Sequence, residues 1–113
     1  MAECIFCKIA NKEIPKSFIS EDSDFLVFED INPKAPVHLL IIPKAHFGPV
    51  DTLNNADEGI LGRMVLKARA VADQIGVSKD GYRLIFNVGK NAGMEIDHIH
   101  LHLLAGKPLK FEF

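Results

Sequence analysis

The sequence predicts an α+β domain in which a mostly antiparallel five-stranded sheet is accompanied by one long helix and a short N-terminal helix. Only one segment keeps a helical period over many residues. Short apolar runs of β type lie before and after this segment instead of alternating with further helices. A chain of 113 residues, 48% of them hydrophobic, has the size and apolar content of one globular unit. We therefore expect a single domain over residues 1–113.

The two helices are predicted from different signals. Residues 4–11 form a short segment that must end before Pro15, because the residue before a proline avoids helical angles. In residues 57–75 the apolar side chains recur with the 3.6-residue period of an amphipathic helix. Asn55 and Glu58 have the spacing of a capping box at its start.

Three glycines accompany the long helix. Gly76 suits the position just after its last turn. Gly59 and Gly62 lie inside it, where each costs roughly 0.5 to 1 kcal/mol relative to alanine. A close approach of another backbone would explain glycine at these two positions, and a subunit interface is one source of such a contact.

Five runs of β type are expected to form the sheet. The first two flank the polar cluster 21–24 and so predict a hairpin. The third is apolar at nearly every position and stops at Pro43, which is the pattern of a strand buried on both faces. A loop that contains glycines joins the last two. The runs are 18–20, 25–28, 37–42, 82–88 and 97–104.

Three of the five histidines, His98, His100 and His102, occupy alternate positions in the last run. In a strand, period 2 places these imidazoles on one face and the apolar residues between them on the other. Imidazole serves as a nucleophile, a proton carrier, a metal ligand or, when charged, a phosphate binder. The row therefore points to chemistry on an anionic or metal-bound substrate. A core strand that merely contains histidines and a catalytic zinc site made by all three are the alternatives.

Charge and hydropathy exclude several classes of partner. The net charge is −2, and no run of lysine or arginine marks a nucleic-acid or anionic-lipid surface. No apolar stretch approaches the length that spans a membrane. We therefore expect a cytoplasmic protein that binds neither nucleic acid nor membrane.

The two cysteines form a Cys-x-x-Cys pair, Cys4 and Cys7. In a reducing compartment such a pair is half of a metal site or a redox motif, not a structural disulfide. A thioredoxin-like motif follows a strand, and no strand fits before Cys4. A tetrahedral zinc site needs two further ligands, for which His38, His46 and the histidine row are candidates.

Two segments together carry a resemblance to a known family. Residues 30–46 read DINPKAPVHLLIIPKAH, and residues 98–105 alternate histidine with apolar residues before closing on a small one. With these segments and Asn87, nearly the whole chain resembles the histidine triad (HIT) superfamily, specifically its Hint branch of nucleotide-binding hydrolases. The resemblance implies a HIT-like fold, a purine nucleotide substrate, a homodimer and the cleavage of nucleoside phosphoramidates through a nucleotidyl-histidine intermediate.

The resemblance also implies roles for individual histidines. His100 matches the nucleophile, whose other ring nitrogen donates its proton to the backbone carbonyl of His98. His102 and His38 match the histidines that contact the phosphate oxygens, where they balance charge during transfer at phosphorus.

The remaining substrate contacts are likewise taken from the family pattern. Asp30 matches the carboxylate that holds the ribose hydroxyls, and Phe28 and Ile31 match apolar positions of the base pocket. Asn87 and the segment at Gly93 match residues near the leaving group.

A structural zinc ion is implied by the same resemblance. Some bacterial members bind zinc through an N-terminal Cys-x-x-Cys, the histidine after Ile-Pro-Lys-x and the first triad histidine. The matching residues here are Cys4, Cys7, His46 and His98. Two thiolates and two imidazoles are the ordinary ligands of a closed structural site.

The chain departs from the family pattern just before the triad. Met94 and Glu95 stand where a glutamine and a serine or threonine are usual. Three interpretations of Glu95 remain open: it faces outward, it is a protonated acid for the leaving group, or the preferred leaving group differs. Two alternative functions remain as well, a dinucleoside polyphosphate hydrolase and a nucleotide-binding module with little turnover.

Overall fold

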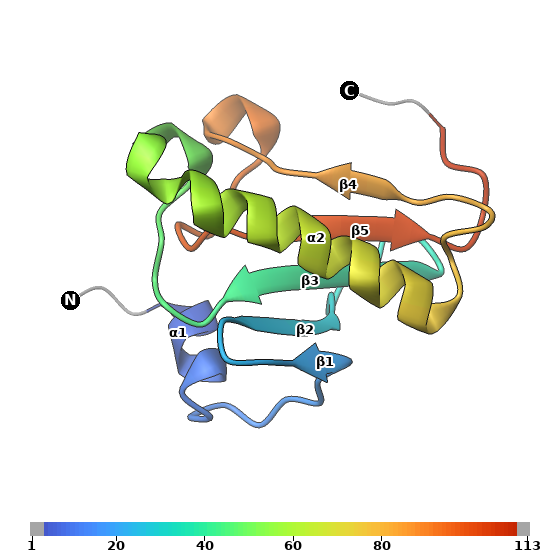
Figure 1. Cartoon of the computed structure of the whole chain (residues 1–113), viewed down its shortest axis with the longest axis horizontal. Helices are drawn as coiled ribbons and strands as arrows, with labels where there is room; N and C mark the ends of the chain where they lie inside the picture. The colour runs from blue at the N-terminus through green and yellow to red at the C-terminus, as the bar shows by residue number, and fades with distance from the viewer. Residues whose placement is uncertain (1–3, 111–113) are drawn as a thin grey trace.

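The chain forms one five-stranded antiparallel sheet with a helix against each face. The computed structural model describes residues 4–110, so residues 1–3 and 111–113 of the expected domain lie outside the described part. The strand order is β1-β2-β3-β5-β4, and every neighbouring pair is antiparallel (Figure 1). The predicted fold class is confirmed. The strands are β1 (Ser20–Glu21), β2 (Phe25–Glu29), β3 (Val37–Pro43), β4 (Arg83–Ile85) and β5 (Leu101–Ala105).

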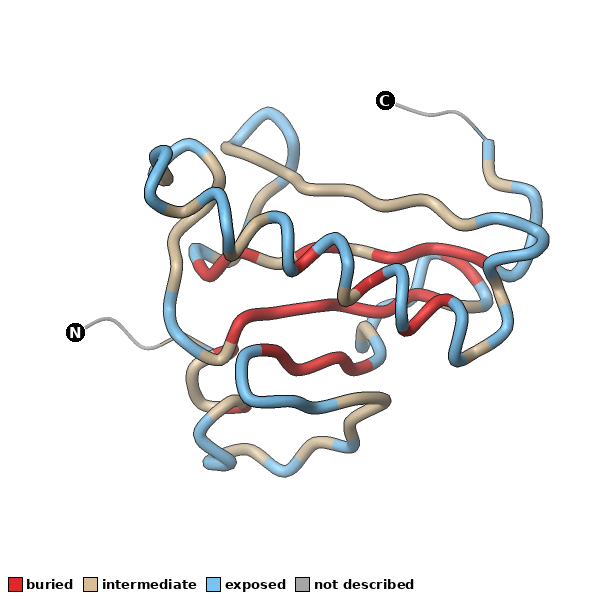
Figure 2. The backbone as a smooth tube through the Cα atoms, viewed as in Figure 1, coloured by how far each residue is buried: buried red, intermediate tan, exposed pale blue. Residues whose placement is uncertain are grey.

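The three central strands are the most buried part of the molecule (Figure 2). Leu39 and Ile41 of β3 belong to the core on one face, whereas Leu40 and Ile42 belong to the core on the other. The prediction of a strand buried on both faces is therefore confirmed. His38 shares the face of Leu40 and Ile42, because side chains alternate along a strand.

Helix α2 (Glu58–Ile75) covers one face of the sheet (Figure 1). Its buried side chains, Met64, Ala68, Val71 and Ala72, follow the helical period and pack on the core that contains Leu39 and Ile41. The helix ends at Gly76, whose φ of 82° is left-handed, as predicted.

The start of α2 differs from the prediction by one residue. The capping box is made by Asn54 and Asp57, not by Asn55 and Glu58. A short 3₁₀ turn, η2 (Asn55–Asp57), precedes the α-helix and moves the cap one position toward the N-terminus. Gly59 and Gly62 face no other backbone within residues 4–110: a Cβ at Gly59 would meet only the Arg63 side chain, and a Cβ at Gly62 would meet nothing.

Helix α1 (Ile5–Ala10) lies on the opposite face of the sheet, near the end of β3 (Figure 1). Phe6 and Ile9 are its buried residues, and they pack with Leu26, Phe28 and the even-numbered apolar residues of β3. The Cys4 side chain caps the helix by accepting the Cys7 N–H at 3.4 Å. The predicted short helix is thus confirmed, and it places both cysteines at one end of the sheet.

The last two strands are shorter than predicted. β4 covers Arg83–Ile85 instead of 82–88, and β5 begins at Leu101 instead of 97. The N–H of Ile99 donates to the carbonyl of Phe47, in the loop after β3, at 2.8 Å, so residues 97–100 leave the sheet ladder. The hairpin at 18–28 is present, with its first strand shifted to Ser20–Glu21. Within residues 4–110 no helix has the length and hydropathy needed to cross a membrane.

Candidate functional site

The histidine row keeps its alternation although only part of it is a strand. Ile99, Leu101 and Leu103 all belong to the core beneath α2, and the three imidazoles lie on the other side. The imidazoles do not converge on one point. The Nδ1 atoms of His98, His100 and His102 each have a different partner, so the arrangement does not support a three-histidine metal site.

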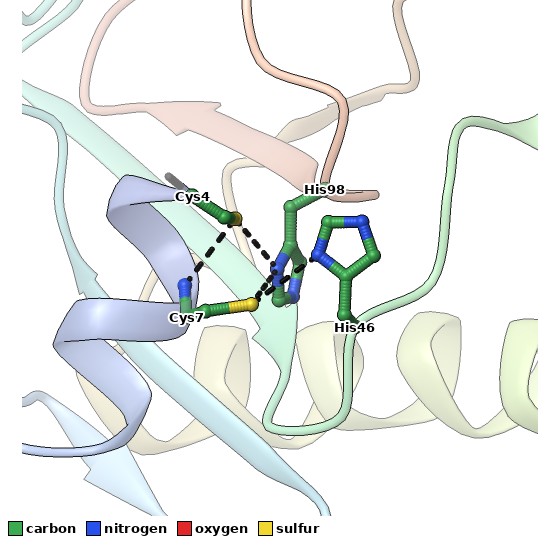
Figure 3. Close-up of side chains that lie close together, drawn as sticks. All are labelled: Cys4, Cys7, His46 and His98. Carbon is green, nitrogen blue, oxygen red and sulfur yellow. Dashed lines mark hydrogen bonds between the residues drawn. The ribbon is translucent and has the colours of Figure 1, made fainter. Parts of the chain in front are cut away.

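The first group of side chains gathers where α1, the loop after β3 and the segment before β5 meet (Figure 3). Its Nδ1 and Sγ atoms all lie within 4.8 Å of one another. His98 Nδ1 is 3.3 Å from Cys4 Sγ and 3.5 Å from Cys7 Sγ, and His46 Nδ1 is 3.2 Å from Cys7 Sγ. We call this set the cysteine group: Cys4, Cys7, His46 and His98.

These distances fit a tetrahedral metal ion. Ligand atoms about 2.1 to 2.3 Å from a zinc ion are separated by roughly 3.4 to 3.8 Å along the edges of the tetrahedron. His98 is fully buried, and its Nε2–H donates to the carbonyl of Pro43 at 2.8 Å. Its Nδ1 therefore carries the lone pair that a metal needs, supported by the backbone contact typical of metal-bound histidine.

Two residues of this group, Cys7 and His98, have shifted pKa values when no cation is bound. Burial, together with the hydrogen bond and charge of Cys4, raises the pKa of Cys7 to about 11. Burial lowers the pKa of His98, so its ring is neutral at physiological pH. Thiols must lose their protons to ligate, so cation binding by the cysteine group would release protons.

His100 is held in one tautomer by the chain itself. Its Nδ1–H donates to the carbonyl of His98 at 2.8 Å, which leaves Nε2 with a lone pair. The Phe6 ring contacts His100 edge-on with centroids 5.2 Å apart, and contacts His98 at 5.8 Å. Sequence reasoning missed Phe6. The only signal was an aromatic side chain between the two cysteines on a short helix.

A second set of hydrogen bonds fixes the protons of His38 and His102. The backbone N–H of Lys34 donates to His38 Nδ1 at 3.0 Å, so a neutral His38 carries its proton on Nε2. That Nε2–H lies 2.9 Å from His102 Nδ1 and donates to it. The proton of His102 is therefore on Nε2. The rings of His100 and His102 are neighbours, with centroids 5.0 Å apart. His100 offers the lone pair of its Nε2, and His102 offers its Nε2–H.

Burial keeps these two histidines neutral. It is the main cause that lowers the pKa of His102 to about 4, with the charges of His100 and His38 acting in the same direction. The pKa of His38 is lowered as well, mainly by burial. Asp30 opposes both shifts, since its Oδ2 lies 3.4 Å from His38 Nε2. We call His38, His100, His102 and Asp30 the triad group.

A cavity of about 370 Å³ opens beside the triad group. It brings together seven of the residues predicted for the site: His38, Asn87, Gly93, Met94, Glu95, His100 and His102. It also includes five that sequence reasoning missed: Asn32, Lys34, Ile85, Ile96 and Leu104. Ile85 precedes Asn87 by two residues, so the strand alternation alone would have placed both on one face.

Three predicted substrate contacts lie outside this cavity. Asp30 borders a neighbouring cavity of about 250 Å³ that shares His38 with the first. Phe28 is buried in the α1-side core, where its ring contacts Phe6 and Phe18. Ile31 is 83% exposed. The roles assigned to these residues stay predictions.

Glu95 is exposed and lines the cavity. Within residues 4–110 it forms no ion pair and no hydrogen bond. By contrast, the exposed Glu21 is paired with Lys12 and Lys44, each at 2.9 Å. The Glu95 carboxylate is therefore free to meet a ligand.

Comparisons with known proteins agree with this geometry. The family described as "Scavenger mRNA decapping enzyme C-term binding" matches residues 3–111. The purine nucleoside phosphoramidase of Escherichia coli K12 is 45% identical over 107 residues, which cover 95% of this chain and 90% of that protein. Protein HitA of Neisseria gonorrhoeae is 44% identical over 96% of this chain and all of its own length.

Solved structures give the same result. A HIT family hydrolase from Legionella pneumophila Philadelphia 1 superposes with a TM-score of 0.93 at 46% identity, covering 96% of this chain and 97% of that one. A histidine triad protein from Clostridium difficile gives a TM-score of 0.94 at 38% identity over the full length of both chains. The chain belongs to the histidine triad family of nucleotide-binding hydrolases.

Proposed function

We propose that this protein hydrolyses purine nucleoside phosphoramidates to the nucleoside monophosphate and an amine. The observation that carries the proposal is the hydrogen bond from His100 Nδ1 to the carbonyl of His98, since it leaves Nε2 ready to attack phosphorus. The similarity to a purine nucleoside phosphoramidase supports the same class of substrate.

The first step forms a covalent intermediate. His100 Nε2 attacks the α-phosphorus, a bond from nitrogen to phosphorus forms, and the bond from phosphorus to the leaving amine breaks as that amine takes up a proton from solvent. His102 Nε2–H lies on the neighbouring ring and would donate to a phosphate oxygen or to the leaving nitrogen. A fixed donor of this kind stabilises charge that develops in the transition state.

The second step returns the enzyme to its starting state. Water attacks the same phosphorus and gives up a proton to solvent, the bond to His100 breaks, and the nucleoside monophosphate leaves. Both steps need His100 in the same tautomer, which the carbonyl of His98 enforces throughout. Splitting one displacement into two easier ones is the advantage of a covalent intermediate.

Adenosine 5′-phosphoramidate tests the proposal. The wild-type protein should release adenylate, and His100→Ala should lower kcat/KM by about a thousandfold or more, because the nucleophile is gone. A brief quench should trap an adenylyl adduct on the wild-type chain in mass spectrometry and none on the variant. Equal rates for the two proteins would refute the assignment.

The same assay separates the alternative functions. Faster cleavage of a dinucleoside polyphosphate than of the phosphoramidate would favour a polyphosphate hydrolase. Tight adenylate binding in calorimetry without turnover would favour a nucleotide-binding module.

We further propose that the cysteine group holds a structural zinc ion. The support is its donor set of two thiols and two imidazoles, and the Pro43 carbonyl that fixes the tautomer of His98. Zinc there would tie α1 to the loop after β3 and to the segment before β5. The carbonyl of His98 lies in that last segment and positions His100.

We also propose that the protein is a homodimer. Val65 and Leu66 of α2 are 41% and 60% exposed, and they form an apolar surface on the helix that carries Gly59 and Gly62. A second copy of the chain would cover this surface. Light scattering should give twice the monomer mass, and Leu66→Asp should reduce it to the monomer value. A wild-type monomer at micromolar concentration would contradict the proposal.

A further inference from the structure

We infer that Glu95 selects the leaving group: the cavity beside His100 favours leaving amines that carry a second, positively charged group and disfavours anionic ones. The inference rests on the proposed function and deepens it by naming the class of leaving group.

The sheet order places the leaving group on the side of β4. β5 carries His102 and continues from His100, and it lies between β3 and β4. Asp30 follows β2, on the β3 side, and it belongs to a different cavity. A nucleoside held by Asp30 therefore extends away from β4. In an in-line displacement the leaving group lies opposite the attacking nitrogen, so it occupies the cavity that Asn87 and residues 93–96 line.

Glu95 contributes the carboxylate of this cavity wall. Among the lining residues it is the one acidic side chain, and Lys34 is the one lysine. Lys34 belongs to the loop between β2 and β3, and its Nζ lies 3.5 Å from the carbonyl of Asn32 in the same loop. The Lys34 ammonium therefore contacts its own loop, and it forms no ion pair with Glu95 within residues 4–110.

The Glu95 carboxylate has no ion-pair partner within residues 4–110, so it is available to contact a substrate. Two exposed carboxylates elsewhere in the chain are instead engaged by lysines: Glu21 by Lys12 and Lys44, and Asp22 by Lys67 at 3.0 Å. A negative charge without a partner attracts a cation that enters the cavity and repels an anion. At about 6 Å in water-like surroundings, attraction in one case and repulsion in the other together amount to about a tenfold difference in kcat/KM. Because Glu95 is exposed, salt should weaken the effect.

Three adenosine 5′-phosphoramidates of equal length test the inference. Each carries on its nitrogen an ethyl chain that ends in an ammonium, a hydroxyl or a carboxylate. For the wild-type protein at low salt we expect kcat/KM to fall in that order, over about tenfold. Glu95→Gln keeps the size of the side chain and should compress the range to about twofold. Potassium chloride at ~0.5 M should compress the wild-type range in the same way.

A matched control separates a local effect from a change in net charge. Asp80→Asn removes one exposed negative charge in the loop after α2, at the other end of the sheet from η3 (Lys90–Ala92) (Figure 1). This variant should keep the wild-type order and range. Equal kcat/KM for the three substrates, or a range in Glu95→Gln as wide as in the wild type, would overturn the inference and leave the proposed function standing. Failure to cleave even the hydroxyl substrate would overturn both.

Discussion

His98 of the cysteine group and His38 of the triad group present opposite ring atoms to their neighbours, because different backbone groups hold the two rings. In the cysteine group a carbonyl, that of Pro43, accepts the Nε2–H of His98 and leaves Nδ1 with a lone pair. In the triad group an N–H, that of Lys34, donates to Nδ1 of His38 and leaves the proton on Nε2. A carbonyl partner thus leaves the other ring nitrogen with a free lone pair, as at His98 and His100, whereas an amide partner leaves an N–H donor, as at His38.

Two clusters of potential ligand atoms occur within residues 4–110, and this difference explains why only one of them is suited to a cation. Asp30, His38 and His102 also place three ligand atoms within 4.8 Å of one another. A metal on His38 Nε2 would move the proton of the neutral ring to Nδ1, where it would face the N–H of Lys34. Two donors would then oppose each other in a buried place, which is costly. The cluster is therefore suited to passing hydrogen bonds toward phosphate and not to holding a metal.

His98 is the residue that joins the two groups. Its side chain faces the cysteines, while its carbonyl accepts the Nδ1–H of the nucleophile His100. A cation held by the side chain would therefore limit the movement of the carbonyl. Loss of zinc should therefore lower turnover, whereas a variant of the triad group that loses turnover should still bind zinc.

The largest effect on this comparison should come from Cys4→Ser combined with Cys7→Ser. We expect the wild-type protein to bind one zinc ion per chain and the double variant to bind none, because two of the four ligands are lost. Turnover of adenosine 5′-phosphoramidate should fall about 10- to 100-fold, since the carbonyl of His98 is less well fixed. Metal analysis and kcat/KM measure the two results.

A variant in the triad group supplies the control for this experiment. His102→Asn should keep one zinc ion per chain while losing most of its turnover. If the double cysteine variant kept its zinc, the cysteine group would not be the metal site. If His102→Asn lost zinc, the separation of the two groups would be wrong.

The sequence predicts the fold and much of the site because their signals are periodic. The alternation of His98, His100 and His102 with apolar residues survives in the structure, since Ile99, Leu101 and Leu103 all need the core beneath α2. The cysteine pair and His46 come together with His98 as the family resemblance implies.

The remaining features depend on contacts that no local pattern encodes. The strand at 97–104 begins only at Leu101, because the N–H of Ile99 bonds to the distant Phe47 carbonyl. The role of Lys34 was missed because it acts through its backbone N–H, which every residue except proline has. Phe6 was missed because its contact with His100 joins segments far apart in the chain.

The smallest effect concerns pH and tests whether burial keeps His102 neutral. Burial lowers the pKa of His38, His98 and His102 below 6.5, in the last case to about 4. Between pH 6.5 and 4 the unfolded chain therefore binds more protons than the folded one, so the free energy of unfolding should fall as the pH falls. His102→Asn removes one of these groups. The slope of the unfolding free energy against pH should therefore decrease by an amount that corresponds to at most one bound proton. Urea unfolding of both proteins from pH 4 to pH 7 measures this difference. The other titratable groups are common to both proteins and cancel between them, so parallel curves would mean that His102 is not kept neutral by burial.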